Sequence, residues 1–338
     1  MRSEASSDVF KVWLYAAASV LLGAWASPLL YNAGKAIAEI CATKQTNGPL
    51  EWLAGLCQTT DFPGFFGVSL LISAVILFLP FMHWLRGGRA GGDGNPWSFR
   101  LPHSARTRTA GQRLAKNPHG LRQGVTGFLL VSALFLMLAG VMVLTGIFEW
   151  KSPGENVAKL VLRASAAALG LAVLQEILFR GIAMGIFLRA MRPAAALGMS
   201  AVFFALVHFL NPPHGVSVID ADASGTGFEL LRNIMARFSH PQVILGTFAP
   251  LLALGGVLAY ARWRTASLCM SIGLHAGWIC TNMILGGVTV AASRPGSILW
   301  VISGASLSQG LVALAGILIA GALANYLTAS ADDTDTPA

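Results

Sequence analysis

The chain has 338 residues, of which 55% are apolar and only 11% are charged, and its formal net charge at pH 7 is +8. A soluble domain carries about 25% charged residues, so this composition excludes a protein that folds in water. The cations cluster at the ends of apolar runs without interleaved aromatic residues, which excludes nucleic acid as a partner. We therefore expect an all-α integral membrane protein whose surroundings are a lipid bilayer.

Eight apolar runs along the chain are long enough to cross a bilayer as helices. About 20 residues at 1.5 Å per residue span roughly 30 Å of hydrocarbon. Lipid offers no hydrogen-bond partner to an open strand, so we expect each run to be helical. The predicted spans are residues 10–31, 64–85, 124–147, 157–188, 194–210, 243–261, 266–285 and 298–327.

The cations predict an orientation. The segment between the second and third predicted helices contains one acid, Asp93, against eight Lys and Arg residues. Short loops rich in Lys and Arg stay in the cytoplasm, and an even number of helices then places both termini on that side. We expect a multi-pass protein of a bacterial inner membrane. The eight cations are Arg86, Arg89, Arg100, Arg106, Arg108, Arg113, Lys116 and Arg122.

This reading divides the chain into three regions. Residues 1–156 form an N-terminal three-helix membrane region with the basic cytoplasmic loop at 87–122. Residues 157–285 contain four further helices, and residues 286–338 contain the last helix and an acidic tail that we expect to be disordered.

The loops on the far side of the membrane carry two further expectations. Cys41 and Cys57 share the first of these loops and could form a disulfide if that face is oxidising. The long loop at 211–242 contains a predicted surface helix at 228–238, which would cover the fifth and sixth helices. The remaining two cysteines lie in one predicted helix and are expected to pack: Cys269 and Cys280.

Three ionisable side chains lie deep within the predicted spans: Glu176, His208 and His275. Such groups cost at least about 2.5 kcal/mol at the centre of a spanning helix, so they mark either function or a buried pair. Counted from the cytoplasmic ends of their helices, they lie roughly 20, 22 and 17 Å deep. A common depth favours a single site built from three helices.

A purely structural interpretation also exists for these residues. Arg180 follows Glu176 by one helical turn and could simply neutralise it. A histidine within a span often serves as an interhelical hydrogen-bonding residue. The agreement in depth favours the shared site over these separate roles.

Three motifs surround these residues, in a fixed order along the chain. They resemble those of the CAAX-protease and bacteriocin-processing family of intramembrane endopeptidases, which includes the type II CAAX prenyl proteases. The family pattern is Glu-Glu-x-x-x-Arg, then Phe-x-x-x-His, then His-x-x-x-Asn or Asp, on core helices of an eight-helix fold. The resemblance covers 157–285 and implies that this region is a catalytic core. The motifs are residues 175–181 (QEILFRG), 204–208 (FALVH) and 275–278 (HAGW).

The chain departs from the family pattern in two places. Gln175 replaces the first acid of the pair, the one usually assigned to catalysis, and an amide is no general base. Ile279 occupies the position of the final Asn or Asp, although Asn282 lies two turns after His275 on the same helix face.

The resemblance implies hydrolysis of a peptide bond in a membrane-anchored protein or peptide, lipidated or transmembrane. The residues carried over as catalytic are Glu176, Arg180, His208 and His275. Glu176 with His208 would activate water, and His275 would face the oxyanion. This mechanism requires no cofactor, although Glu176, His208 and His275 could instead hold a zinc ion.

Two alternatives come from other functional classes. An inactive relative would keep the fold and act as a membrane-protein binding or immunity factor, which Gln175 favours. A transporter would use Glu176 and the histidines as a proton relay, but such proteins are typically built from two matching halves with broken helices, which the sequence lacks.

Overall fold

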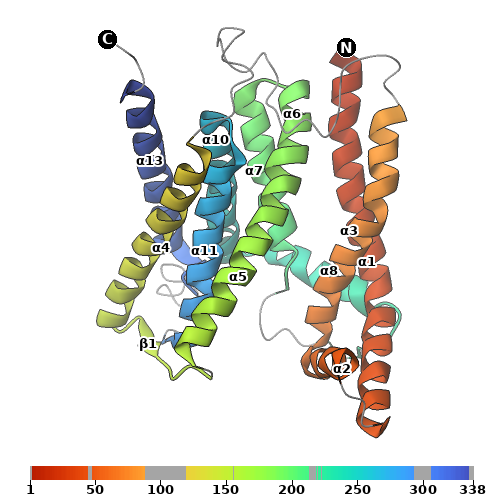
Figure 1. Ribbon diagram of the computed structural model, residues 1–338. Coiled ribbons are helices and arrows are strands. Elements are labelled where there is room, and N and C mark those ends of the chain that lie inside the picture. The colour runs from red at the N-terminus through yellow and green to blue at the C-terminus, as the bar shows by residue number, and fades with distance from the viewer. Residues whose placement is uncertain are drawn as a thin grey trace. The chain divides into compact units, whose positions relative to one another are not determined.

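The computed structural model shows a chain built almost entirely of long helices (Figure 1). The chain forms two compact units, one containing residues 1–96 and 209–239 and the other containing residues 97–208 and 240–338. The residues that the structure describes are 2–44, 48–87, 119–154, 156–212, 218, 220–221, 223–292 and 306–334.

The first unit consists of two long helices and two short ones. In Figure 1 the two long helices, α1 and α3, run side by side and α2 is seen end-on, so α2 crosses them. Helix α8 packs on α1 so closely that a Cβ atom on Gly227 would overlap the carbonyl of Ala24. The elements are α1 (Arg2–Lys44), α2 (Pro49–Thr59), α3 (Phe62–Gly87), α8 (Thr226–Ala236) and a short turn, η4 (Arg237–Ser239).

Lys35 of α1 holds the end of α2. Its ammonium group donates hydrogen bonds to the carbonyls of Cys57, Gln58 and Thr60, at 2.9, 3.0 and 2.8 Å. The last carbonyls of a helix have no partner within the helix and carry partial negative charge, so one cation satisfies them and the helix dipole together. This contact fixes where α2 ends and α3 begins.

The second unit contains the remaining helices and one short ribbon of two antiparallel strands. The ribbon pairs Phe148 with Ala291 and joins the ends of two helices, α4 and α11. The elements are α4 (Gly120–Leu144), β1 (Phe148–Trp150), α5 (Val157–Glu176), η3 (Ile177–Ala183), α6 (Met184–Ala190), α7 (Pro193–Phe209), α9 (Pro241–Val243), η5 (Ile244–Phe248), α10 (Ala249–Thr265), α11 (Leu268–Val288), β2 (Thr289–Ala291) and α13 (Gly310–Thr334).

Helix α11 lies between α4 and α5, and glycines bring it close to α4. A Cβ atom on Gly273 would overlap the carbonyl of Gly124, and one on Gly277 would lie 2.7 Å from the carbonyl oxygen of Phe128. Glycines four residues apart let helix backbones approach closely, which is a common way of packing helices in lipid. His275 lies between these two glycines, so its backbone is held firmly against α4.

Small residues also set the distance between α5 and α11. Ala164, Ala168 and Ala172 are fully buried and recur every fourth residue along one face of α5. Two of them pack with Cys280 of α11 in one apolar cluster. The next residue of this stripe is Glu176, which therefore enters the same tight interface.

The all-α, polytopic fold predicted from composition is confirmed. Seven described helices are long and apolar enough to cross a membrane, and the remaining predicted span, 194–210, corresponds to α7, a shorter apolar helix of 17 residues. Helix α1 runs well beyond the predicted end of the first span. A helix also occupies the region predicted at 228–238.

Several expectations concern loops and cysteines. All four cysteines are free, so Cys41 and Cys57 form no disulfide. Most of the predicted cytoplasmic loop, residues 88–118, lies outside the described residues. Helix α13 continues to Thr334, and the last four residues of the acidic tail lie outside the described part.

Candidate active site

Glu176 is the last α-helical residue before the backbone widens. The next seven residues, Ile177–Ala183, form a π-helical turn, after which the α-helix resumes as α6. Such turns are rare inside α-helices and frequently occur at functional sites. The Glu176 side chain is fully buried at this junction.

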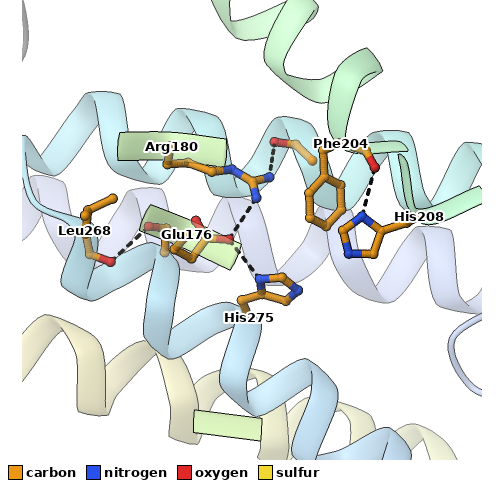
Figure 2. Close-up of polar contacts among 8 residues, drawn as sticks. Glu176, Arg180, Phe204, His208, Leu268 and His275 are labelled. Carbon is orange, nitrogen blue, oxygen red and sulfur yellow. Dashed lines mark hydrogen bonds and ion pairs between the residues drawn. The ribbon is translucent and has the colours of Figure 1, made fainter. Parts of the chain in front are cut away.

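One carboxylate oxygen of Glu176 accepts two hydrogen bonds. Oε1 lies 2.8 Å from Nη1 of Arg180, one turn along the same helix, and 2.8 Å from Nδ1 of His275 on α11 (Figure 2). All three side chains are almost completely buried. Buried charges are tolerated when they are paired and hydrogen-bonded, and here Arg180 balances the carboxylate. His275 therefore contributes an N–H donor without having to supply a second positive charge.

The second oxygen, Oε2, is buried and accepts no hydrogen bond from the described residues. The Ser271 hydroxyl lies beside the carboxylate, but its one proton goes to the carbonyl of Leu268 at 2.9 Å. Oε2 thus keeps lone pairs that a water molecule or a substrate N–H could use.

Arg180 connects the carboxylate to two other helices. Its Nη2 donates to the carbonyl of Gly255 on α10 at 3.1 Å, and its guanidinium lies over the ring of Phe204 on α7, 4.3 Å from the ring centre. A Cβ atom on Gly255 would lie only 3.0 Å from backbone atoms of Ala201, so the glycine lets α10 approach α7. One guanidinium thereby joins three helices around Glu176.

His208 lies near His275 but does not contact the carboxylate directly. Its Nδ1 is 2.9 Å from the carbonyl oxygen of Phe204, and the two histidine rings are 6.3 Å apart between centres. A carbonyl and a carboxylate only accept hydrogen bonds, so Nδ1 carries the proton in both histidines. The Nε2 atoms, which are then lone-pair acceptors when the rings are neutral, point toward one another in Figure 2.

The four residues predicted as catalytic thus come together, in a pairing that differs from the one expected. The sequence suggested that Glu176 would face His208 or else be held by Arg180. In the structure it contacts Arg180 and His275 simultaneously. Glu176 can therefore form an ion pair with Arg180 and a hydrogen bond with a histidine at the same time.

Gln175, which departs from the family pattern, and Asn282, the nearest substitute for the missing Asn or Asp at Ile279, lie close to this cluster in the sequence. Gln175 precedes Glu176, and its buried Oε1 has no hydrogen-bond partner among the described residues. Asn282 donates to the carbonyl of Trp278 within its own helix, at 2.9 Å. Asn282 thus donates its hydrogen bond within α11, to Trp278 and not to His275.

The described side chains do not form a three-ligand zinc site. Among the described residues, no group of three or more His, Cys, Asp or Glu side chains is placed to hold a metal. Oε1 of Glu176 is occupied by two N–H donors, whereas each histidine donates through Nδ1 and keeps its Nε2 lone pair free. Two histidine nitrogens alone do not complete the three protein ligands of a catalytic zinc site.

Some contributors to the site could not be found from the sequence. The Gly255 acceptor is a backbone carbonyl, and the only indication of it is the Gly255–Gly256 pair in an apolar span. Aromatic residues that flank the two histidines in the sequence make packing contacts. Trp278 makes an edge contact with Phe135, with 4.8 Å between ring centres, and Phe203 packs against Phe179 and Phe187.

The fold and the site define an integral, multi-pass membrane protein with a buried glutamate, arginine and histidine cluster. Residues 157–281 match the family described as type II CAAX prenyl endopeptidase Rce1-like, and all four site residues lie within this segment. The matched segment contains the three motifs whose resemblance to the CAAX-protease family was noted in the sequence. No curated protein and no solved structure matches the chain.

Proposed function

We propose that the protein is an intramembrane endopeptidase that hydrolyses a peptide bond in a membrane-anchored protein or peptide, either lipidated or transmembrane. The observation that carries this proposal is the hydrogen bond between Glu176 and His275. A carboxylate that accepts from one nitrogen of an imidazole fixes the tautomer and leaves the other nitrogen as a base. The family of residues 157–281 supports both the reaction and an anchored substrate.

The proposed reaction begins with a water molecule between the two Nε2 atoms. A separation of 6.3 Å between the ring centres is compatible with one bridging water. His275 accepts a proton from this water as its oxygen attacks the scissile carbonyl carbon, and Glu176 stabilises the resulting imidazolium. His208 accepts the second hydrogen bond from the water and orients it. The proton on His275 then passes to the leaving amine as the C–N bond breaks.

Glu176 is a positioning residue in this mechanism, because His275 is the group that exchanges protons with water. Arg180 neutralises Glu176 in the resting state and is not required to contact substrate. The proposed steps require no metal. Because the active groups are buried among helices, the scissile bond must enter from the membrane side, which favours anchored substrates over soluble ones.

The test uses purified protein in lipid vesicles and one fluorogenic peptide in two forms, with and without a lipid or transmembrane anchor. We expect cleavage of the anchored form, and a loss of about 10²–10⁴-fold in kcat for His275→Gln. Equal cleavage of both forms would contradict the anchored substrate class. Full activity in His275→Gln would contradict the assigned base.

A second candidate is a relative that binds anchored proteins without cutting them. Two observations favour it: Gln175 provides no second carboxylate, and Oε1 of Glu176 is already engaged by Arg180. This candidate predicts that the anchored peptide binds wild type and His275→Gln equally and remains intact in both.

A further inference from the structure

The ring of Phe204 lies between two of the polar groups described above. It is fully buried on α7, with the guanidinium carbon of Arg180 4.3 Å from its centre. The imidazole of His208 is 3.9 Å from the same centre, inclined by 32°. Figure 2 shows the phenyl ring between the guanidinium and the imidazole. Aromatic packing alone would not require a cation near one side of the ring and an imidazole near the other.

Phe204 also contacts His208 and His275 in two further ways. Its backbone carbonyl accepts the Nδ1 proton of His208 at 2.9 Å, which fixes the tautomer of that ring. The phenyl ring makes an edge contact with His275, with 5.5 Å between ring centres and planes at 68°. One residue thus determines the tautomer of His208 through its main chain and the ring orientation through its side chain.

We propose that Phe204 is a positioning residue, whose ring keeps the Arg180 cation apart from His208 and holds the imidazole with Nε2 toward His275. This inference rests on the proposed function for its kinetic consequence only. A cation is attracted to the electron-rich face of an aromatic ring, so Arg180 is retained on its side of the ring while it binds Glu176. The phenyl ring also limits rotation of His208.

A leucine at this position is apolar and of similar size but has no flat face. Arg180 then loses its aromatic partner and His208 loses the surface that fixes its plane, although the backbone hydrogen bond from His208 remains available. Misplacing a reacting group by about 1 Å costs up to about 10²-fold in rate. Substrate contacts made elsewhere are unaffected, so KM changes little.

Phe203 provides a matched control. It is the preceding residue on α7, is likewise buried, and packs against Phe179 and Phe187. For Phe204→Leu we expect kcat to fall about 10- to 100-fold with KM within about twofold, and for Phe204→Tyr we expect most of the activity to return. Phe203→Leu should lower Tm similarly but leave kcat within about threefold. Equal kcat losses in the two leucine variants would show that Phe204 is only a packing residue.

A spectroscopic measurement separates this inference from the proposed function. In protein with isotope-labelled histidine, the ring protons of His208, assigned with His208→Gln, should be shifted upfield by the adjacent phenyl ring. Phe204→Leu should remove that shift and Phe203→Leu should keep it. An unshifted His208 signal in wild type would overturn the inference. A shifted signal in a protein that cleaves nothing would contradict the proposed function alone.

Discussion

Nδ1 of His275 lies 2.8 Å from Oε1 of Glu176, although the two residues are 99 positions apart in the chain. The alanine stripe of α5 sets the distance between α5 and α11, and the glycines of α11 hold that helix, with His275, against α4. The proposed chemistry therefore depends on apolar helix packing as much as on the polar residues. Substitutions can test the packing and the polar contacts separately.

Glu176→Gln should abolish cleavage and also destabilise the protein. The amide leaves Arg180 buried without its counter-charge, which costs about 3–5 kcal/mol. The measurements are Tm in detergent or lipid and the cleavage rate of the anchored peptide.

The double variant Glu176→Gln with Arg180→Met separates the two effects. Replacing a buried ion pair by uncharged groups is often neutral, so Tm should recover. Activity should stay absent because His275 still lacks its carboxylate. If cleavage returned together with Tm, Glu176 would have only a structural role.

Gln175→Glu tests the departure from the family pattern. Since Glu176 already contacts His275, we expect the added carboxylate to change the cleavage rate by no more than about threefold. A new general base would instead raise the rate by about 10²–10⁴-fold. The comparison is kcat/KM for the two proteins at one pH. A silent wild type together with an active Gln175→Glu variant would show that position 175 must supply the base.

Gly273→Ala should separate α11 from α4 and displace His275. Its new Cβ would overlap the carbonyl of Gly124, and overpacking of this kind costs about 1–3 kcal/mol. Gly286→Ala is the control on the same helix, because nothing lies within 4 Å of a Cβ there. We expect reduced Tm and cleavage only in Gly273→Ala, and equal behaviour of the two variants would contradict the proposed role of the close contact.

Lys35→Met should weaken the junction between α2 and α3. It removes a charged donor from three carbonyls, and a hydrogen bond to a charged group contributes about 1.5–3 kcal/mol. Lys159→Met, at an exposed position of α5, is the matched control. Lower Tm is expected in the first variant alone, and an unchanged Tm there would contradict the capping role.

The orientation predicted from the cations can be measured on one span. Helices α5 and α6 with the π turn form a continuous apolar stretch of 34 residues, Val157–Ala190. In a cysteine-free background, Arg192→Cys should react with a membrane-impermeant thiol reagent only from the cytoplasmic side. Lys159→Cys should react only from the opposite side. The reverse pattern would invert the whole topology.

Much of the architecture follows from hydropathy, because crossing a bilayer requires long apolar helices whatever their tertiary contacts. Glu176, His208 and His275 lie close together, as expected from their similar depths in the membrane, since residues at one level on adjacent helices can meet. The full length of α1 was missed because its residues beyond 31 are more polar than a lipid-facing helix requires. Helix α1 also contacts α2 and α3, and tertiary contacts of this kind are not visible in hydropathy.

The particular pairing within the site depends on features that the sequence does not display. An acceptor such as the carbonyl of Gly255 exists at every residue, so only the helix arrangement selects it. Whether Glu176 pairs with His208 or with His275 depends on which helix packs closely against α5. Small residues allow such close packing, but because they are common in every membrane span the sequence does not show which pair of helices uses them.

The π turn at Ile177–Ala183 has a consequence for the descent of this domain. A π turn contains one residue more than the α turn it replaces, so deletion of a single residue would restore a regular helix that still spans the membrane. Side chains beyond the turn would keep about their present direction, because the wider turn absorbs the extra residue, whereas those within it, including Arg180, would shift relative to Glu176. A lineage could thus lose catalysis through one missing codon, with all its charged residues retained.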